Sequence, residues 1–399
     1  MTGVGLNSFG GPVAQIGVMH RVAVEERRWV SEAQFVHLLN FANILPGPEA
    51  LEIAIHLGYI RRGVWGGIAA GVLFIWPGFF TLTLLAWIYQ SWGHLGPVAG
   101  FLDGIRPVAM ALVAAAAVRI SRKALQGGIA YLLMTASFLA SFLFGVQFLI
   151  ILVGCGLLGL GLGRYRRATT QPRAFGWMFL ALVAGLLAWR MAGPVGAGFV
   201  PAAGETLPGS PSAAAESETR SDKTPGRLAD IAWVNTKAAL VTFGGAYTVL
   251  PYLREQVVHV HPWLTDRQVV DALALGETTP GPLICVGVFL SFLAGGLPGA
   301  LVGCLFLFLP SFVLVLTLGR SIERVEKIPR SRDVLWGFSA GTLGLILALA
   351  AGLVPASLPG AAAWILAAAA FLAVHRWRVN PLLVVLAGGV IGTIGIRLA

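Results

Sequence analysis

Long, continuous stretches of apolar residues recur along the whole chain, with short polar loops between them. A helix needs about 20 apolar residues to cross a hydrocarbon core of about 30 Å. The strands of a membrane barrel would instead alternate apolar and polar residues over about ten positions. Continuous stretches therefore predict transmembrane helices, which satisfy their own backbone hydrogen bonds in lipid. The expected segments are 3–19, 35–60, 64–89, 97–118, 128–144, 146–163, 174–190, 231–252, 268–293, 296–319, 334–354, 360–375 and 381–397.

Composition supports an all-α integral membrane protein with about 13 transmembrane segments. The chain is 57% hydrophobic and 12% charged, with a mean hydropathy of +0.80. Soluble domains carry about 25% charged residues, so a water-soluble fold is excluded. The formal net charge is +10, but Lys and Arg lie in short loops between apolar stretches. That distribution reflects membrane topology and does not indicate a nucleic-acid partner.

The motifs of several other chemistries are absent from the sequence. Cys155, Cys285 and Cys304 lie within apolar stretches without CxxC spacing, which argues against a disulfide framework or a zinc site. There is no GxxxxGK[ST] phosphate loop, no HExxH and no GxSxG. We therefore expect no enzymatic activity, no cofactor and no direct drive by ATP. The first apolar segment lacks the features of a signal peptide and is expected to be a retained helix.

The chain contains an internal duplication. Residues 9–48 align without a gap to residues 243–282, and one single-residue gap extends the alignment to Gly104 and Gly337. The corresponding residues include Trp29 and Trp263, Gln34 and Gln268, Pro46-Gly47-Pro48 and Pro280-Gly281-Pro282, Pro77 and Pro310. Between the halves, Pro, Ser, Ala, Glu and Thr replace the apolar pattern, as in flexible linkers. We expect a first repeat over 1–200, a polar linker over 201–227 and a second repeat over 228–399.

Loop charges predict that the two halves are inserted in opposite orientations. Cytoplasmic loops carry an excess of Lys and Arg. Here, in each pair of equivalent loops, one loop is basic and the other is uncharged, and the basic loop alternates between the two halves. The basic loops, each opposite an uncharged counterpart, contain Arg61 and Arg62; Arg320, Arg324, Lys327, Arg330 and Arg332; Arg119, Arg122 and Lys123; Arg376 and Arg378. Four consecutive reversals require an odd number of crossings in the first half. The N-terminus is then cytoplasmic, unless a re-entrant PGP segment changes this placement.

The Pro-Gly-Pro elements predict paired helix breaks. Proline removes a backbone donor and disfavours helix in the preceding residue, and glycine permits a sharp turn. In transporters with inverted repeats, such breaks lie near the midplane and form the substrate site. The half-helices that begin at Pro48 and Pro282 offer free N–H groups and a positive dipole end, which suit an anion. The glycine pairs 10–11 and 244–245, with Pro12 and Tyr247 beside them, are expected to face the same place.

Polar residues cluster at these breaks. Charges at mid-bilayer cost about 2.5–3.5 kcal/mol each on insertion scales, so they should face a protein interior or a cavity. The cluster comprises Asn40, Asn43, Glu49 and Glu52 at the first break, and Asp271, Glu277, Thr278 and Thr279 at the second. Thr278 and Thr279 can donate hydrogen bonds to an oxyanion, and Glu277 is the expected proton carrier, with a purely structural carboxylate as the alternative. Arg106 and Lys237 are candidate counter-charges, although Lys237 can instead snorkel.

Five motifs give the sequence a resemblance to the chromate ion transporter family in its long two-domain form. They are SFGGP (8–12), VEERRW (24–29), LNFANILPGPEA (39–50), FGGAYTVLPY (243–252) and GETTPGPLI (276–284). The sequence departs from the family pattern where Leu51-Glu52 replaces Gln-Gln after PGPEA, and where Val288 replaces Gln. Fewer amide donors at the presumed site leave the choice of oxyanion open.

The resemblance implies a secondary transporter that exports chromate across the inner membrane, driven by the proton-motive force, and so confers chromate resistance. The implied partners are a chromate or sulfate-like oxyanion, protons and the lipid bilayer, with a homodimer left open. Uptake or exchange of sulfate, or a scaffold or sensor without transport, are the alternatives. Carried over by motif or position, the expected binding residues are Gly10, Gly11, Pro12, Asn43, Pro46, Gly47, Pro48, Glu49, Arg106, Gly244, Gly245, Tyr247, Thr278, Thr279, Pro280, Gly281 and Pro282, with Glu277 as the proton-coupling residue.

Overall fold

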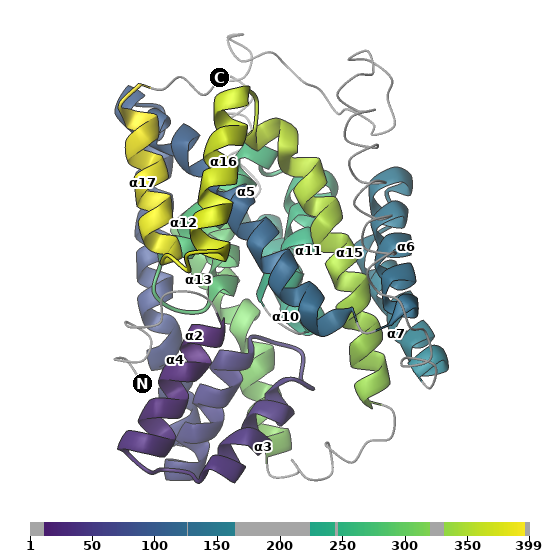
Figure 1. Ribbon diagram of the computed structural model, residues 1–399. Helices are drawn as coiled ribbons and strands as arrows, with labels where there is room; N and C mark the ends of the chain where they lie inside the picture. Colours follow the sequence, from purple (N-terminus) through teal and green to yellow (C-terminus); the bar gives the residue numbers. More distant parts are fainter. Residues whose placement is uncertain (1–11, 126, 164–223, 244–245, 320–330, 396–399) are drawn as a thin grey trace.

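The structure of the protein is a computed structural model, and it describes residues 12–125, 127–163, 224–243, 246–319 and 331–395. All regular secondary structure in these ranges is helical (Figure 1). In chain order the elements are α2 (Pro12–His20), η1 (Arg21–Glu26), α3 (Glu32–Ala42), α4 (Glu49–Trp92), α5 (Gly96–Ala124), α6 (Gly128–Phe144), α7 (Phe148–Leu162), α10 (Thr224–Val241), η3 (Ala246–Val249), α11 (Leu250–Arg254), η4 (Glu255–Val260), α12 (Asp266–Thr278), η5 (Leu283–Cys285), α13 (Val286–Leu318), α15 (Ser331–Ser357), α16 (Ala361–His375) and α17 (Pro381–Thr393). The expected segment 174–190 and residues 201–223 of the expected linker fall outside the described residues, whereas residues 224–227 of that linker form the start of α10.

The described helices confirm an all-α membrane protein. Four are long and apolar enough to cross a membrane: Glu49–Trp92, Gly96–Arg122, Leu283–Leu318 and Asp333–Ser357. Shorter apolar helices are α6, α7, α16 and α17. Large apolar side chains such as Trp65 and Phe144 remain exposed, as expected for surfaces that face lipid.

Two of the long helices are hairpins and not straight rods. The backbone leaves the helical region at Arg62 and Gly63 in α4, and at Gly295 and Gly296 in α13. The second residue of each pair has a φ of 63° or 64°, which glycine adopts without strain. Beyond each turn the chain folds back on itself: a Cβ atom at Gly58 would overlap the Gly66 carbonyl group in α4, and one at Gly299 would overlap the Ser291 carbonyl group in α13. The arms are 49–61 and 64–92 in α4, and 286–294 and 297–318 in α13.

The expected segments 35–60 and 268–293 are therefore not continuous helices. The first consists of α3, the break and the first arm of α4, and the second consists of α12, the break, η5 and the first arm of α13. The rings of Phe41 and His56 meet at 5.6 Å between centroids, so the first arm of α4 folds back along α3. After the PGP segment of the first half the chain thus turns back along α3, instead of continuing as one straight helix.

The duplication is visible in the local structure. The π-helix η1 corresponds to η4, and the hairpin turn of α4 corresponds to that of α13. Equivalent capping boxes begin the helix before each break: Ser31 with Gln34 starts α3, and Thr265 with Gln268 starts α12. In each box the side-chain oxygen accepts the N3 backbone N–H, and the glutamine returns the bond.

Equivalent helices of the two halves run in opposite directions. In Figure 1, α5 (blue) descends from the upper part of the molecule, whereas its counterpart α15 (yellow-green) rises from the lower end. This antiparallel relation agrees with the inverted repeats that the loop charges predict.

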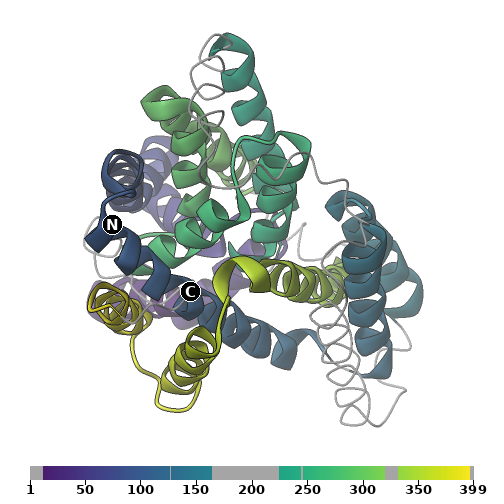
Figure 2. The ribbon, with the colours of Figure 1, turned by 90° about the horizontal axis from the view of Figure 1, so that it is seen from above.

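The halves also interlock. Helix α5 packs against α16 and α17 of the second half, and α15 packs against α6 and α7 of the first. In Figure 2, α16 and α17 (yellow) lie at the opposite side of the molecule from α6 and α7 (blue). Glycines permit the close approach, because a Cβ atom at Gly104 would overlap the carbonyl oxygen of Gly388, and one at Gly337 would overlap that of Cys155.

Candidate functional site

The first break lies between α3 and α4. Helix α3 ends at Ala42, where the Asn43 side-chain amide donates to the Leu39 carbonyl oxygen at 2.7 Å. The side chain of Asn43 is thus occupied in ending the helix. Gly47 has a φ of 146°, a conformation that L residues rarely adopt, and Pro48 occupies the N-cap of α4 without a side-chain cap. The N–H groups of the first turn of α4 are therefore left without a capping side chain.

The second break repeats this geometry after α12. Gly281 has a φ of 108°, and Pro282 is the N-cap of the 3₁₀ turn η5, again without a side-chain cap. The hydroxyl groups of Thr278 and Thr279 donate to the carbonyl oxygens of Leu275 and Gly276 at 2.7 Å and 2.8 Å. In this conformation the two threonines end α12, and they must release these bonds before they can donate to an anion.

Each break is seated on the other half of the protein. A Cβ atom at Gly47 would overlap the hydroxyl group of Ser311 in α13, and one at Gly281 would lie 3.2 Å from the Cα atom of Gly78 in α4. Gly78 and Ser311 are equivalent residues, each directly after a proline inside its helix. The arrangement is therefore reciprocal, and each break contacts one of the two helices, α4 and α13, that also pack against each other.

Two further hydrogen bonds connect the breaks across the halves. The N–H group of Gly47 donates to the Thr242 carbonyl oxygen, just after α10, at 2.8 Å. The side-chain amide of the buried Gln15 in α2 donates to the Gly281 carbonyl oxygen at 2.6 Å. Each break is thus held by the first helical region of the opposite half.

Glu277, the expected proton-coupling residue, is buried at the end of α12 and accepts a hydrogen bond from the phenol of Tyr247 in η3. The structure therefore brings these two expected residues together. The charge of the exposed Arg119 at the end of α5 acts on both of them. The sequence pattern placed Arg119 only in a basic loop, and nothing in it linked this arginine to Glu277.

Arg106 is held in an ion-paired network and is not free at the breaks. Its guanidinium donates to the Asp271 carboxylate at 2.7 Å and 3.0 Å and also contacts Asp103. Tyr89 donates a third hydrogen bond to Asp271 at 2.9 Å, and the Asp271 side chain is fully buried. The sequence identified Arg106 and Asp271 separately as polar groups within apolar stretches, but it did not pair them. Two opposite charges in apolar stretches are the signal that could have suggested the pair.

The two breaks differ in charge. Glu49 and Glu52 lie in the first turn of α4, where an ionised carboxylate opposes the approach of an anion. The turn η5 and the first turn of α13 contain no acidic residue. Of the two uncapped helix starts, the one after Pro282 is the more favourable for a negative ligand.

The remaining expected residues are four glycines, Pro12 and Lys237. Gly10, Gly11, Gly244 and Gly245 lie outside the described residues. Pro12 begins α2. The ammonium group of Lys237 lies 4.6 Å from the ring centroid of Trp233, a cation–π contact on the same helix.

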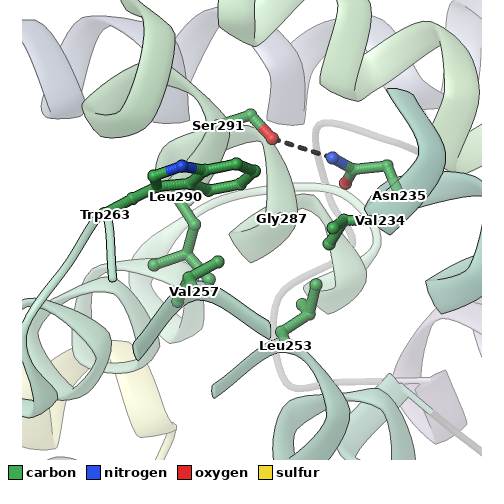
Figure 3. A pocket seen from close by; sticks show the side chains of 8 residues that line it. All are labelled: Val234, Asn235, Leu253, Val257, Trp263, Gly287, Leu290 and Ser291. Carbon is green, nitrogen blue, oxygen red and sulfur yellow. Dashed lines mark hydrogen bonds between the residues drawn. The ribbon is translucent and has the colours of Figure 1, made fainter. Parts of the chain in front are cut away.

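A small pocket lies in the second half, away from the breaks (Figure 3). The Asn235 amide of α10 donates to the Ser291 hydroxyl group of α13 at 3.0 Å and to the Ile231 carbonyl oxygen at 2.8 Å. The other residues that line the pocket are apolar or glycine: Val234, Leu253, Val257, Trp263, Gly287 and Leu290. Without a charged side chain in its lining, this pocket does not suit an oxyanion, and the polar pair joins α10 to the hairpin of α13.

These observations define the class: a multi-pass helical membrane protein whose two equivalent, oppositely directed halves hold each other's broken helices. A family model described as chromate transporter matches residues 1–160 and 229–393. The chain belongs to this family.

Several proteins that are similar to this chain over most of its length are named as chromate transport proteins. A chromate transport protein of Pseudomonas aeruginosa is 34% identical over 397 residues, which cover 97% of this chain and 89% of that protein. One of Cupriavidus metallidurans is 28% identical and covers 86% of this chain and 78% of that protein. A probable chromate transport protein of Synechococcus elongatus is 29% identical, with coverage of 86% and 80%. No solved structure matches the chain.

Proposed function

We propose that this protein is a secondary transporter that exports chromate across the cytoplasmic membrane, coupled to the proton-motive force, and that it confers chromate resistance. Membership of the family and the names of the relatives support chromate as the cargo. The observation that carries the proposal is the pair of helix breaks at equivalent positions, each seated on the opposite half. Inverted repeats with broken helices are the architecture of alternating-access transporters, with the substrate between the repeats.

In this proposal the dianion binds at the second break. The N–H groups at the start of η5 have no capping side chain and can donate to the dianion. No acidic residue lies in this turn. Thr278 and Thr279 change partners from their own helix to the anion when it arrives. Glu277, with Tyr247 beside it, takes up the coupling proton.

The first break has a different task in this scheme. Gly47, between Pro46 and Pro48, lets the chain turn against α13, and the acidic Glu49 in the first turn of α4 disfavours an anion there. Arg106, already neutralised by Asp271 and Asp103, positions α5 against α12 and does not bind the anion.

Sulfate is the second candidate cargo. It is a tetrahedral dianion like chromate, and backbone N–H groups recognise charge and shape without distinguishing the central atom. Uptake or exchange of sulfate by the same architecture is therefore the alternative that the experiment must separate from chromate export.

The test is flux through purified protein in vesicles with an imposed pH gradient. We expect chromate to move faster than sulfate, in the direction that the gradient sets, and expression in a chromate-sensitive host should lower cell-associated chromium. Sulfate flux without chromate flux would establish the alternative, and a gradient-independent chromate flux would remove the proton coupling.

Proline variants test the breaks themselves. Pro46→Ala and Pro280→Ala should each abolish flux, because alanine restores a backbone donor and lets the helix continue. Pro381→Ala is the control, since Pro381 is the first residue of α17, where proline is not needed for a break. Full flux through both break variants, with protein present in the membrane, would indicate a scaffold or sensor without transport.

A further inference from the structure

Glu52, one turn into α4, is a buried carboxyl group without a hydrogen-bonding partner. Its side chain is 1% exposed, and neither carboxyl oxygen makes a hydrogen bond. The hydroxyl group of Ser311 in α13 faces it and is also unpartnered. His56, one turn further along α4, is buried with an unpartnered Nδ1 atom. Glu52 and Ser311 are thus enclosed together without the hydrogen bonds that buried polar groups normally make, whereas the His56 ring contacts Phe41 and Tyr59.

The other two buried acids of the described chain have donors. Asp271 accepts three hydrogen bonds from Arg106 and Tyr89, and Glu277 accepts one from Tyr247. Glu52 differs from both. With no cation beside it and only the Ser311 hydroxyl group facing it, the carboxylate form of Glu52 is strongly unfavourable, and such a buried group becomes neutral by binding a proton.

The carboxyl group of Glu52 lies directly against the first break. A Cβ atom at Gly47 would overlap both a Glu52 carboxyl oxygen and the Ser311 hydroxyl group, so these two groups enclose the Gly47 backbone. The N–H group of Gly47 is at the same time bonded to the Thr242 carbonyl oxygen of the other half. A change of charge on Glu52 therefore acts at the junction between the halves.

The groups that face Glu52 come from three directions. On its own helix this is the acidic Glu49, one turn earlier. Helix α13 contributes the neutral Ser311, and the end of α10 contributes the Thr242 carbonyl group through Gly47. Among the described residues, no Lys or Arg side chain forms an ion pair with it.

We propose that Glu52 is a second proton-binding site of the transport cycle, closed by Ser311 of the opposite half. The proton is bound in the conformation described here. When the halves move apart at this junction, water reaches the carboxyl group, which releases its proton to that water and becomes charged. The charged form resists closure of the junction, so the state of Glu52 determines whether the halves can close. This inference rests on the proposed transport function for its role in the cycle.

The decisive variant is Glu52→Gln, which keeps the shape of the side chain but cannot ionise. Two measurements are made on protein in vesicles: exchange of labelled chromate at equal concentrations without a pH gradient, and net chromate flux with one. We expect the exchange rate to stay within about twofold of the parent protein, because the fold is retained. A twofold change in rate corresponds to about 0.3–0.4 kcal/mol of activation free energy. The factor by which the pH gradient accelerates net chromate flux should fall about tenfold or more.

Glu255→Gln is the matched control. Glu255 is half-buried and accepts a hydrogen bond from the Phe148 backbone N–H at 2.9 Å, which a glutamine oxygen can also accept. Its hydrogen bond is to α7, which contributes no residue to either break, so its variant should keep the full response to the pH gradient. An unchanged gradient response in Glu52→Gln would overturn the coupling role.

A second readout does not depend on transport. Infrared spectra of the protein at neutral pH should contain the carbonyl absorption of protonated carboxyl groups, and Glu52→Gln should remove the component that Glu52 contributes, whereas Glu255→Gln should retain it. An identical band in Glu52→Gln and the parent protein would overturn the proton site. If the parent protein moved no chromate but showed the Glu52 band, the proposed function would fail while proton binding at Glu52 stood.

Discussion

Replacing Arg106 with methionine removes the cation that neutralises a fully buried carboxylate. The guanidinium donates to Asp271 at 2.7 Å and 3.0 Å, and the Asp271 side chain is 0% exposed. Methionine fills much of the same volume without a charge. In Arg106→Met the Asp271 carboxylate keeps only the hydrogen bond from Tyr89.

The expected loss of stability is several kcal/mol. Two unit charges 4 Å apart interact with about 4 kcal/mol at an effective dielectric constant of about 20. Removing one partner of a buried pair costs about 3–5 kcal/mol, because the remaining charge is left uncompensated. The retained bond from Tyr89 places Arg106→Met toward the lower end of that range. The measurement is the midpoint and free energy of unfolding of the purified protein in detergent.

The structure offers a matched control in Arg254 and Asp266. This pair has the same two-bond geometry, at 2.7 Å and 2.7 Å, but its side chains are 18% and 30% exposed. Arg254→Met should therefore cost about 1 kcal/mol or less, as for other solvent-accessible pairs. Equal losses in the two variants, or a loss below about 1 kcal/mol in Arg106→Met, would refute the reasoning from burial.

The double variant Arg106→Met with Asp271→Asn separates a positioning role from a binding role. Replacing both partners of a buried pair is often close to neutral, so the double variant should regain most of the lost stability. If Arg106 positions α5 against α12, chromate flux should recover with stability. Recovery of stability without recovery of flux would instead assign the guanidinium to the substrate, as the sequence first suggested.

Three further outcomes are expected from other parts of the structure. Gly281→Ala places a side chain at a φ of 108° and a Cβ atom 3.2 Å from a neighbouring backbone, so it should lower stability by about 1–2 kcal/mol and abolish flux, whereas Gly17→Ala, exposed in open space on α2, should leave both unchanged. Gly104→Leu overlaps the backbone of α17 and should cost about 3 kcal/mol or more in unfolding experiments, whereas Gly154→Leu meets no neighbour and should cost little. Single cysteines at the turns of the α4 and α13 hairpins, in a chain without native cysteines, should react with impermeant reagents from opposite sides of the membrane. Labelling of both from one side would contradict the inverted repeat.

Much of the fold could be predicted because its causes are local. Proline and glycine interrupt helices wherever they occur, so the breaks and the repeat follow from the positions of Pro46–Pro48 and Pro280–Pro282. The sequence left open whether the chain folds back after the first break. Direction after a break depends on what the next helix packs against, and here that partner is α13, far away in the sequence.

The contacts between the halves could not be predicted for the same reason. Arg106 and Asp271 are 165 positions apart in the sequence. Their counterparts in the repeat are Ser339 and His37, and since serine carries no charge, these two residues cannot form an ion pair. The duplication therefore gives no hint of this ion pair. Gln15 and Ser311 are likewise unremarkable in the sequence, and their importance appears only when the opposite break is placed beside them.

The reciprocal seating of the breaks has a consequence for how transport can proceed. The Gly47 N–H group is bonded to the end of α10, and the Gly281 carbonyl oxygen is bonded to Gln15 of α2. Neither half can therefore move relative to the other without changing the contacts of both breaks at once. A carrier must avoid opening its substrate site to both sides together, and this double attachment provides a physical link between the two openings. Glu52, enclosed at one of these junctions, is the group whose charge can decide when the link is released.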